Sequence, residues 1–359
     1  MTEKKRYTHI DLLEVIAISF VLIYHSTLYE YDFLENANAL RYASYLFRTI
    51  LSTCVPMFFL TNGYLLFSKE YNLKKHWKRM AQLSVIPFFW GMVFMLIYMP
   101  LKGQDISTKQ IVLALFNLKT EWHINFFWYI GALICIYILF PALKQLFDND
   151  NKSFVLVTVT LFMTTFGVTL LNQLLLFVGA IIHHPLGTIN YPIILMFVPL
   201  RHYGYSFVYF CLGGILYRNE DKLLAYGKSK RNACAAAGII FSCLFLFLIG
   251  VFLSRSNGEI WDVVWNGYDT IPTFINVLCI YVLSLNYRKR INLIEEVSRN
   301  TLGIYLFHGM IITMTREYIK SYEFLCNIPI NLIYAAAILA VSMIIVKIMK
   351  KIPFVRLLT

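Results

Sequence analysis

Residues 9–25 read HIDLLEVIAISFVLIYH, an apolar run that contains two carboxylates and ends on a histidine. The run continues from Ile10 to about Tyr29, which is longer than the core of a secretory signal peptide, about 7–15 residues. A short basic segment, residues 1–6, precedes it. We therefore expect a retained first transmembrane helix that starts on the cytoplasmic side.

Nine further apolar stretches are each long enough to cross about 30 Å of hydrocarbon at about 1.5 Å per residue. They cover residues 45–67, 81–100, 123–143, 154–180, 202–218, 232–253, 267–285, 299–318 and 328–349. Hydrophobic residues make up 58% of the chain and charged residues 14%, against roughly 45–50% and 25% in soluble domains. The sequence predicts an all-α polytopic membrane bundle of about ten helices, a single domain over 1–359 with no appended soluble domain.

The placement of positive charge tests the predicted number and orientation of the spans independently, because short cytoplasmic loops are enriched in Lys and Arg. With ten spans and an inside amino terminus, the inside segments hold 23 of the 32 Lys and Arg residues. The pattern holds at every loop except two: the inner loop with Lys144 and Lys152 is weakly charged, and one outer loop holds Lys102, Lys109 and Lys119. We expect both termini in the cytoplasm, and topology and anionic membrane lipid explain the net charge of +12 better than nucleic acid does.

Motifs of soluble enzymes are absent from the sequence. The seven cysteines are scattered, mostly within apolar spans, and no pair has the spacing of metal ligands or of a redox motif. There is no glycine-rich phosphate loop and no serine nucleophile elbow. We expect no metal site and no bound cofactor.

Ionisable residues inside apolar spans are costly and are therefore functional candidates. Glu14 and His25 are eleven residues apart, so on a helix they lie on almost the same face and about 16 Å apart along the axis. Asp11 lies within about 40° of that face. The helix could present an acidic entrance and a buried imidazole along one wall. Alternatively, the carboxylates favour the helix amino terminus and His25 is a packed core histidine. His308 and Tyr305, in the ninth predicted span, are the other buried polar candidates.

Five segments carry motifs in a defined order. They are Arg6 with Ile10–Leu13, Ala17 and His25; Pro56–Leu66; Arg79–Trp90; Trp122–Pro141; and Ser298–His308 with its Gly-Ile-Tyr-Leu-x-His element. Together they resemble acyltransferase family 3, the bacterial integral membrane O-acyltransferases that modify surface glycans and other exported molecules. The resemblance spans nearly the whole chain.

The resemblance implies acyl transfer from acyl-CoA, which would be a co-substrate. His25 would be the base or the nucleophilic imidazole, since imidazole exchanges protons near neutral pH. Asp11 or Glu14 would order the entrance or orient a charge. The family usually has arginine at the position of Glu14 and at that of Gln82.

Donor-binding candidates lie near the start of the third predicted span. Arg79, Lys75 and Lys78 would attract the phosphates of the donor, with Gln82 in the second position of the family's arginine pair. The alternative for the lysines is that they set topology and contact lipid headgroups.

Acceptor-side candidates gather on the predicted outer side. They are His123, Trp128, Arg201 and His202. Aromatic and polar residues together suit stacking on sugar rings, although aromatic belts at membrane interfaces are also routine. The stretch 185–199 is interrupted by proline and could be a re-entrant or lid segment.

Two functions of different class follow. The first is an O-acyltransferase, most simply an O-acetyltransferase. It would move an acyl group from cytoplasmic acyl-CoA to a hydroxyl of a surface polysaccharide or its lipid-linked precursor in a bacterial cell membrane. The second is a transporter or exporter of a glycan or another polar solute, in which the buried ionisable residues form the path. The sequence favours the enzyme.

Overall fold

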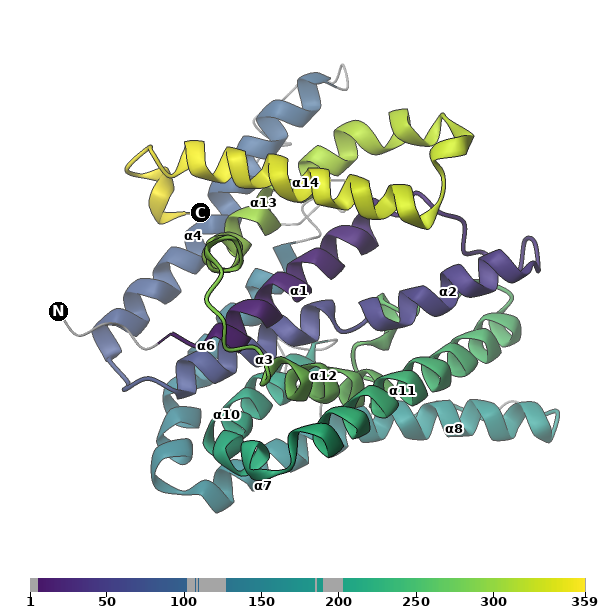
Figure 1. The fold of residues 1–359 in the computed structure, drawn as a ribbon, viewed down its shortest axis with the longest axis horizontal. Coiled ribbons are helices and arrows are strands. Elements are labelled where there is room, and N and C mark those ends of the chain that lie inside the picture. Colours follow the sequence, from purple (N-terminus) through teal and green to yellow (C-terminus); the bar gives the residue numbers. More distant parts are fainter. Residues whose placement is uncertain are drawn as a thin grey trace.

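The computed structural model describes residues 6–101, 107, 109, 127–184, 186–189 and 203–358, and within them the regular elements are helices, with no strand (Figure 1). The predicted all-α class is confirmed for these residues. The helices are α1 (Thr8–Ser26), α2 (Ala39–Leu51), α3 (Cys54–Phe67), α4 (Leu73–Leu101), α6 (Trp128–Asn149), α7 (Asn151–Phe162), α8 (Val168–Ile181), α10 (Gly204–Ala225), α11 (Lys228–Asn257), α12 (Ile271–Ser284), α13 (Asn292–Lys320) and α14 (Ile328–Met349).

Seven helical stretches of the described chain are long and apolar enough to cross a membrane. They are Thr8–Ser26, Ala39–Phe67, Leu73–Ile97, Trp128–Asn149, Asn151–Ile181, Lys228–Asn257 and Ile328–Met349. The other three predicted spans coincide with α10, α12 and α13. The 14 residues of α12 reach only about 21 Å, and α10 and α13 carry charged residues within their length. The ten-span count and the cytoplasmic termini therefore stay predictions.

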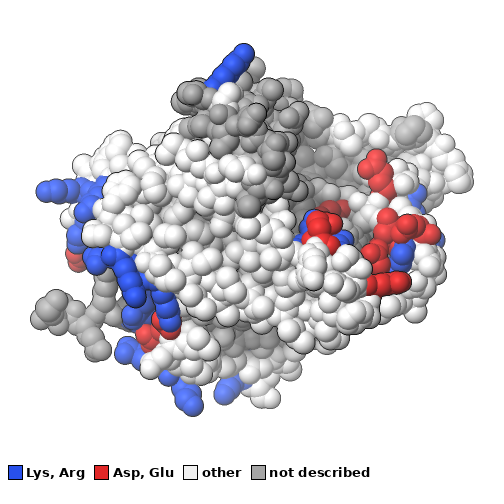
Figure 2. All heavy atoms as spheres, turned by 90° about the horizontal axis from the view of Figure 1, so that it is seen from above, with Lys and Arg blue, Asp and Glu red and all other residues white. Residues whose placement is uncertain are grey.

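Charged side chains separate along the molecule. On the face that Figure 2 shows, Lys and Arg gather at the end that carries both termini in Figure 1, the Asp and Glu in view lie mostly toward the opposite end, and the surface between them is largely uncharged. Such a surface is one that lipid tails would cover, because charge is excluded from hydrocarbon. The arrangement agrees with a bundle that crosses a membrane along its longer dimension.

Helices α3 and α10 pack with their backbones in contact. A Cβ atom on Gly63 would lie 2.7 Å from the carbonyl carbon of Phe210, and one on Gly213 would overlap the carbonyl oxygen of Leu60. Small residues allow helix backbones in membranes to approach this closely. The contact fixes the position of α3, which supplies Asn62 to the site described below.

Helix α1 lies in the middle of the bundle, against α13, α14 and α3 (Figure 1). Its last turn is held by the fully buried Asn331 of α14, whose amide donates to the carbonyl of Ile23 at 3.1 Å. The Asn331 side-chain oxygen accepts from the backbone N–H of Leu28 at 3.0 Å. Carbonyls in the last turn lack partners within the helix. Asn331 therefore anchors the end of α1 that carries His25.

Candidate active site

A cavity of about 950 Å³ lies among α1, α3, α4, α6 and α13. Glu14 and His25 both line it, so it extends about 16 Å along one face of α1. The end near Glu14 faces the basic end of the molecule, and we call it the inner end. The end near His25 is the outer end.

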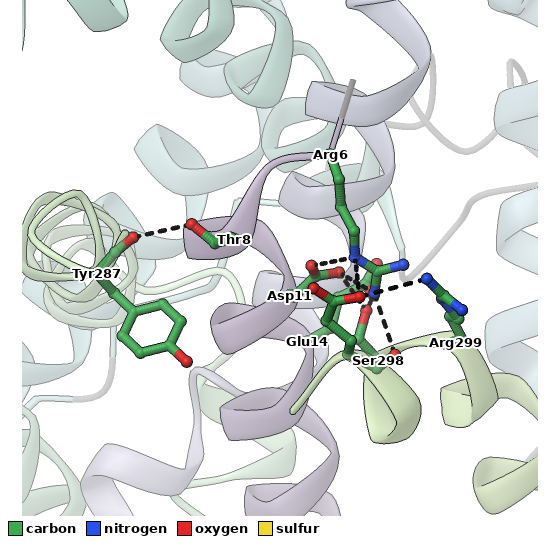
Figure 3. Close-up of polar contacts among 8 residues, drawn as sticks. Arg6, Thr8, Asp11, Glu14, Tyr287, Ser298 and Arg299 are labelled. Carbon is green, nitrogen blue, oxygen red and sulfur yellow. Dashed lines mark hydrogen bonds and ion pairs between the residues drawn. The ribbon is translucent and has the colours of Figure 1, made fainter. Parts of the chain in front are cut away.

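Two carboxylates of α1 have different surroundings at the inner end (Figure 3). Arg6 pairs with Asp11 through two contacts, at 2.7 and 2.9 Å. The hydroxyl of Ser298, from α13, lies 2.7 Å from an oxygen of Asp11 and 2.7 Å from an oxygen of Glu14. Its single hydrogen can be donated to one of them at a time. Arg6 thus neutralises Asp11 away from the cavity, and of these two carboxylates Glu14 is the one that lines it.

Arg79 of α4 faces this carboxyl-bearing wall. Its Nε donates to the hydroxyl of Tyr137 at 3.0 Å, and that hydroxyl donates to the side-chain oxygen of Asn62 at 3.2 Å. Arg79 and Asn62 both line the cavity. A guanidinium held along one edge by a phenol keeps its remaining N–H groups for other acceptors. The chain of contacts therefore presents an oriented cation at the inner end.

The other donor-side candidates divide into two groups. Gln82 lines the cavity, and its amide donates to the carbonyl of Leu357 in the carboxy-terminal segment. Lys75 and Lys78 are exposed near the start of α4 and are not part of the cavity wall. The structure thus brings Arg79 and Gln82 into the site and leaves the two lysines outside it.

Two histidines meet at the outer end. The rings of His25 and His308 are 5.3 Å apart, and both line the cavity. Nδ1 of His308 is 2.6 Å from the carbonyl oxygen of Tyr305, one turn earlier on α13. His308 is 1% exposed overall, whereas His25 is exposed to the cavity space. A backbone carbonyl is therefore one polar partner of the buried His308 ring.

A buried ion pair fixes the residue beside His25. The hydroxyl of Tyr24 donates to Asp262 at 2.7 Å, and Arg48 pairs with the same carboxylate at 3.1 Å. The guanidinium of Arg48 is also stacked over the ring of Tyr31, 3.9 Å from its centroid. Because Arg48 is only 1% exposed, Asp262 is needed to compensate its charge. Arg48 of α2 and Asp262, in the segment that follows α11, therefore hold Tyr24 and with it the last turn of α1.

Aromatic side chains line the same cavity as the two histidines. Trp128, at the start of α6, lines the cavity together with Trp265 and Tyr268 of the segment before α12. Trp128 stacks on Tyr203 with ring centroids 4.7 Å apart and meets Trp265 edge-on at 5.3 Å. The other acceptor-side candidates, His123, Arg201 and His202, lie outside the described residues, as does most of the stretch 185–199. Trp128 is thus the one acceptor-side candidate that can be placed.

Several wall residues were not singled out from the sequence. Ser298 and Arg299 belong to the motif Ser298–His308, in which only Tyr305 and His308 were named as candidates. In the sequence, Arg316 is indistinguishable from an ordinary charge near a helix end. Trp265 and Tyr268 read as interface aromatics. Arg299 could have been selected because it lies four residues before the Gly-Ile-Tyr element of the same motif. No local sequence pattern indicates that Trp265 lines a cavity. Across the described ranges, no group of three or more His, Cys, Asp or Glu residues is arranged to hold a metal ion.

Comparison with known proteins identifies the family. A family model described as an acyltransferase domain, acyltransferase family 3, matches residues 7–347. Neither the curated proteins nor the solved structures give a match. The family match covers almost the whole chain, so the chain belongs to this acyltransferase family.

Proposed function

We propose that this member of acyltransferase family 3 is an integral membrane O-acyltransferase. It takes an acyl group, most simply acetyl, from cytoplasmic acyl-CoA. The acceptor is a hydroxyl of a cell-surface polysaccharide or of its lipid-linked precursor in a bacterial cell membrane. The observation that carries the proposal is one continuous cavity with an oriented cation, Arg79, at the inner end and a histidine, His25, at the outer end.

The dimensions of the cavity suit a thioester donor. Arg79 and Glu14 line the same end, and Glu14 and His25 are about 16 Å apart along α1. An extended pantetheine arm can bridge this length, with its phosphates at the inner end and its thioester carbonyl beside His25. The imidazole then acts on the acyl carbon as a nucleophile, or on the acceptor hydroxyl as a base.

Charge at the inner end supports the same orientation of the donor. Arg79 and Arg299 line the cavity, and the exposed Lys75 and Lys78 lie near the start of the same helix as Arg79. These cations attract phosphates. Glu14 has the opposite effect, because a carboxylate disfavours the passage of phosphate farther inward. Its oxygens can instead accept hydrogen bonds from the amide N–H groups of the pantetheine arm.

The aromatic wall at the outer end supports a sugar acceptor. Trp128, Trp265 and Tyr268 present ring faces and edges to the same space as the two histidines. Aromatic rings pack against the apolar faces of sugars while the sugar hydroxyls stay free for polar partners. A hydroxyl of such an acceptor can therefore reach the acyl carbon from the outer end.

The test compares cells that produce the wild-type protein or His25→Ala, matched for the amount of protein in the membrane. NMR of the isolated surface polysaccharide measures ester groups per sugar repeat. We expect their loss in His25→Ala and their retention in His184→Ala, because His184 is an exposed histidine beyond α8. Unchanged esterification in His25→Ala would rule out the proposed role of this histidine.

Export of a polar solute is the second candidate function. The observation in its favour is that ionisable residues, Glu14 and His25 among them, line a cavity that runs toward both ends of the bundle. The same experiment separates the two functions. A transporter variant would lower the amount of surface polysaccharide at constant ester content, whereas an enzyme variant lowers the ester content at constant amount.

A further inference from the structure

We infer that Asp262 is a positioning residue, which holds His25 of α1 and the aromatic side of the cavity at a fixed distance from each other. The inference rests on the proposed acyltransferase function and concerns how the acceptor is aimed at the acyl carbon. Asp262 lies in the segment 258–270, which follows α11 and precedes α12. It is not part of the cavity wall, so it acts through the residues that it holds.

The two oxygens of the Asp262 carboxylate serve different parts of the chain. Oδ1 accepts from the backbone N–H groups of Val264 at 3.0 Å and of Trp265 at 3.3 Å. Oδ2 accepts from the hydroxyl of Tyr24 at 2.7 Å. Trp265 and Tyr24 both line the cavity, and Tyr24 directly precedes His25 in the sequence. One carboxylate therefore links the last turn of α1 to the turn that carries Trp265.

The segment 258–270 has other anchors, but they lead to other helices. The hydroxyl of Tyr45, on α2, donates to the carbonyl of Trp261 at 2.6 Å. The backbone N–H of Trp261 donates to the hydroxyl of Ser254, on α11, at 2.9 Å. These bonds hold the segment in the bundle, whereas the bond from Tyr24 to Asp262 joins it to α1.

Arg48 makes Asp262 a strong acceptor. Its guanidinium is 1% exposed and lies 3.1 Å from Oδ1 of Asp262, so the pair is stable when both groups are charged. Hydrogen bonds to a charged carboxylate are shorter and stronger than those to a neutral oxygen. Because the ion pair is neutral as a whole, its contribution to the site is the orientation of Tyr24 and Trp265.

Acyl transfer requires such orientation. The acceptor oxygen must lie about 3–3.5 Å from the acyl carbon, with the reacting orbitals aligned. In the proposed function, His25 of α1 places the acyl carbon, and Trp265 and Tyr268 of the segment 258–270 contact the acceptor. The two reactants are thus held by separate parts of the chain, and Asp262 sets the distance between them. Arg79, at the inner end, is not part of this link, so donor binding should not depend on it.

The experiment measures kcat and KM of the purified full-length protein with acetyl-CoA and with surface polysaccharide isolated from cells that lack the protein. The variant is Tyr24→Phe, which keeps the ring, removes the bond to Asp262 and leaves the ion pair with Arg48 in place. We expect kcat to fall by about 10–100-fold, because a misplacement of about 1 Å can cost that much. The KM for acetyl-CoA should stay at the wild-type value.

The matched control is Tyr45→Phe. It removes the same kind of hydrogen bond from the residue directly before Asp262, but the bond comes from α2 and not from α1. Thermal melting should show a similar decrease in Tm for both variants, while kcat of Tyr45→Phe stays at the wild-type value. Equal loss of kcat in the two variants would show a general loosening of the segment 258–270 and would overturn the inference.

Tyr24 also lines the cavity, so a direct contact of its hydroxyl with substrate has to be separated from the link. Asp262→Asn keeps that hydroxyl, but its single accepting oxygen cannot serve both Tyr24 and the N–H of Trp265 in the way that two carboxylate oxygens do. We expect the same fall in kcat as in Tyr24→Phe, and no further fall in the double variant, because both changes break one link. Effects that multiply in the double variant would overturn the inference.

Asp262→Asn leaves the buried Arg48 without its counter-charge and can therefore fail to fold. In that case Arg48→Met combined with Asp262→Asn, which removes both charges, takes its place in the comparison. A wild-type kcat in Tyr24→Phe would overturn the inference, as would a KM for acetyl-CoA that rises as much as kcat falls. A wild-type protein that forms no ester would instead contradict the proposed function itself.

Discussion

The contact between α3 and α10 can be tested by adding a single methyl group. In Gly63→Ala the new Cβ would overlap the carbonyl oxygen of Phe210 and lie 2.7 Å from its carbonyl carbon. Carbon atoms in contact are normally about 3.5–4.0 Å apart, so the two helices must separate by at least about 1 Å. The obstacle is backbone and not a flexible side chain, so it cannot rotate away. We expect a loss of about 1–3 kcal/mol in the free energy of unfolding, typical of overpacking.

Thermal melting of the detergent-solubilised protein measures this loss, and a decrease of about 2–10 °C in Tm corresponds to it. The matched control is Gly131→Ala in α6, where a Cβ would meet no atom within 4 Å. There the methyl group should leave Tm unchanged or raise it, because alanine favours the helix over glycine by about 0.5–1 kcal/mol. Equal Tm values for the two variants would refute the argument that glycine is needed for close packing.

The same substitution should also affect the site. Asn62 precedes Gly63 and accepts the hydrogen bond of Tyr137, which in turn holds Arg79. A shift of α3 by roughly 1 Å would lengthen these contacts and loosen the cation at the inner end. We therefore expect the Gly63→Ala protein that remains folded to have a higher KM for acetyl-CoA than the Gly131→Ala protein.

Two further substitutions address the two ends of the cavity. Arg79→Ala should raise the KM for acetyl-CoA by roughly 10–100-fold with a smaller change in kcat, because it removes a charge-assisted contact worth about 1.5–3 kcal/mol. Initial rates measure this, and an unchanged KM would contradict donor binding by Arg79. Asn331→Leu should cost about 1–3 kcal/mol, because the N–H of Leu28 and the carbonyl of Ile23 lose their buried partner. Thermal melting and amide exchange in the last turn of α1 measure it, and wild-type values in both would refute the anchoring role.

Much of the helical layout could be predicted from the sequence, because apolar runs report helices directly. The predicted span 328–349 coincides with α14, and the predicted span 232–253 lies within α11, whose ends extend through polar residues to Lys228 and Asn257. Hydropathy detects the apolar centre of a helix, whereas the hydrogen bonds of its polar ends are set locally. Boundaries were therefore less predictable than the presence of each helix.

Breaks within the predicted spans could not be foreseen. The predicted span 45–67 is divided between α2 and α3, where the hydroxyl of Ser52 donates to the carbonyl of Thr49 and that of Thr53 to the carbonyl of Ile50. Ser52 also shares a hydrogen bond with Thr273 of α12, at 2.8 Å. Hydroxyl groups that bond to the preceding turn also occur within continuous helices. What distinguishes the break between α2 and α3 is the contact of Ser52 with Thr273 on α12. Because Thr273 is far away in the sequence, no local pattern predicts the break.

The two carboxylates of α1 show how the site itself goes beyond the sequence. From spacing alone, Asp11 and Glu14 are nearly equivalent, since both lie close to the face of His25. In the folded protein, Arg6 pairs with Asp11 at 2.7 Å, and Glu14 is the one that lines the cavity. Ser298, which contacts both, comes from α13. A carboxylate that Arg6 does not pair with and one that it neutralises differ in their effect on an anionic donor, so the assignment of roles depends on partners that only folding brings together. This is why Glu14, and not Asp11, is the residue whose charge should govern entry of the donor.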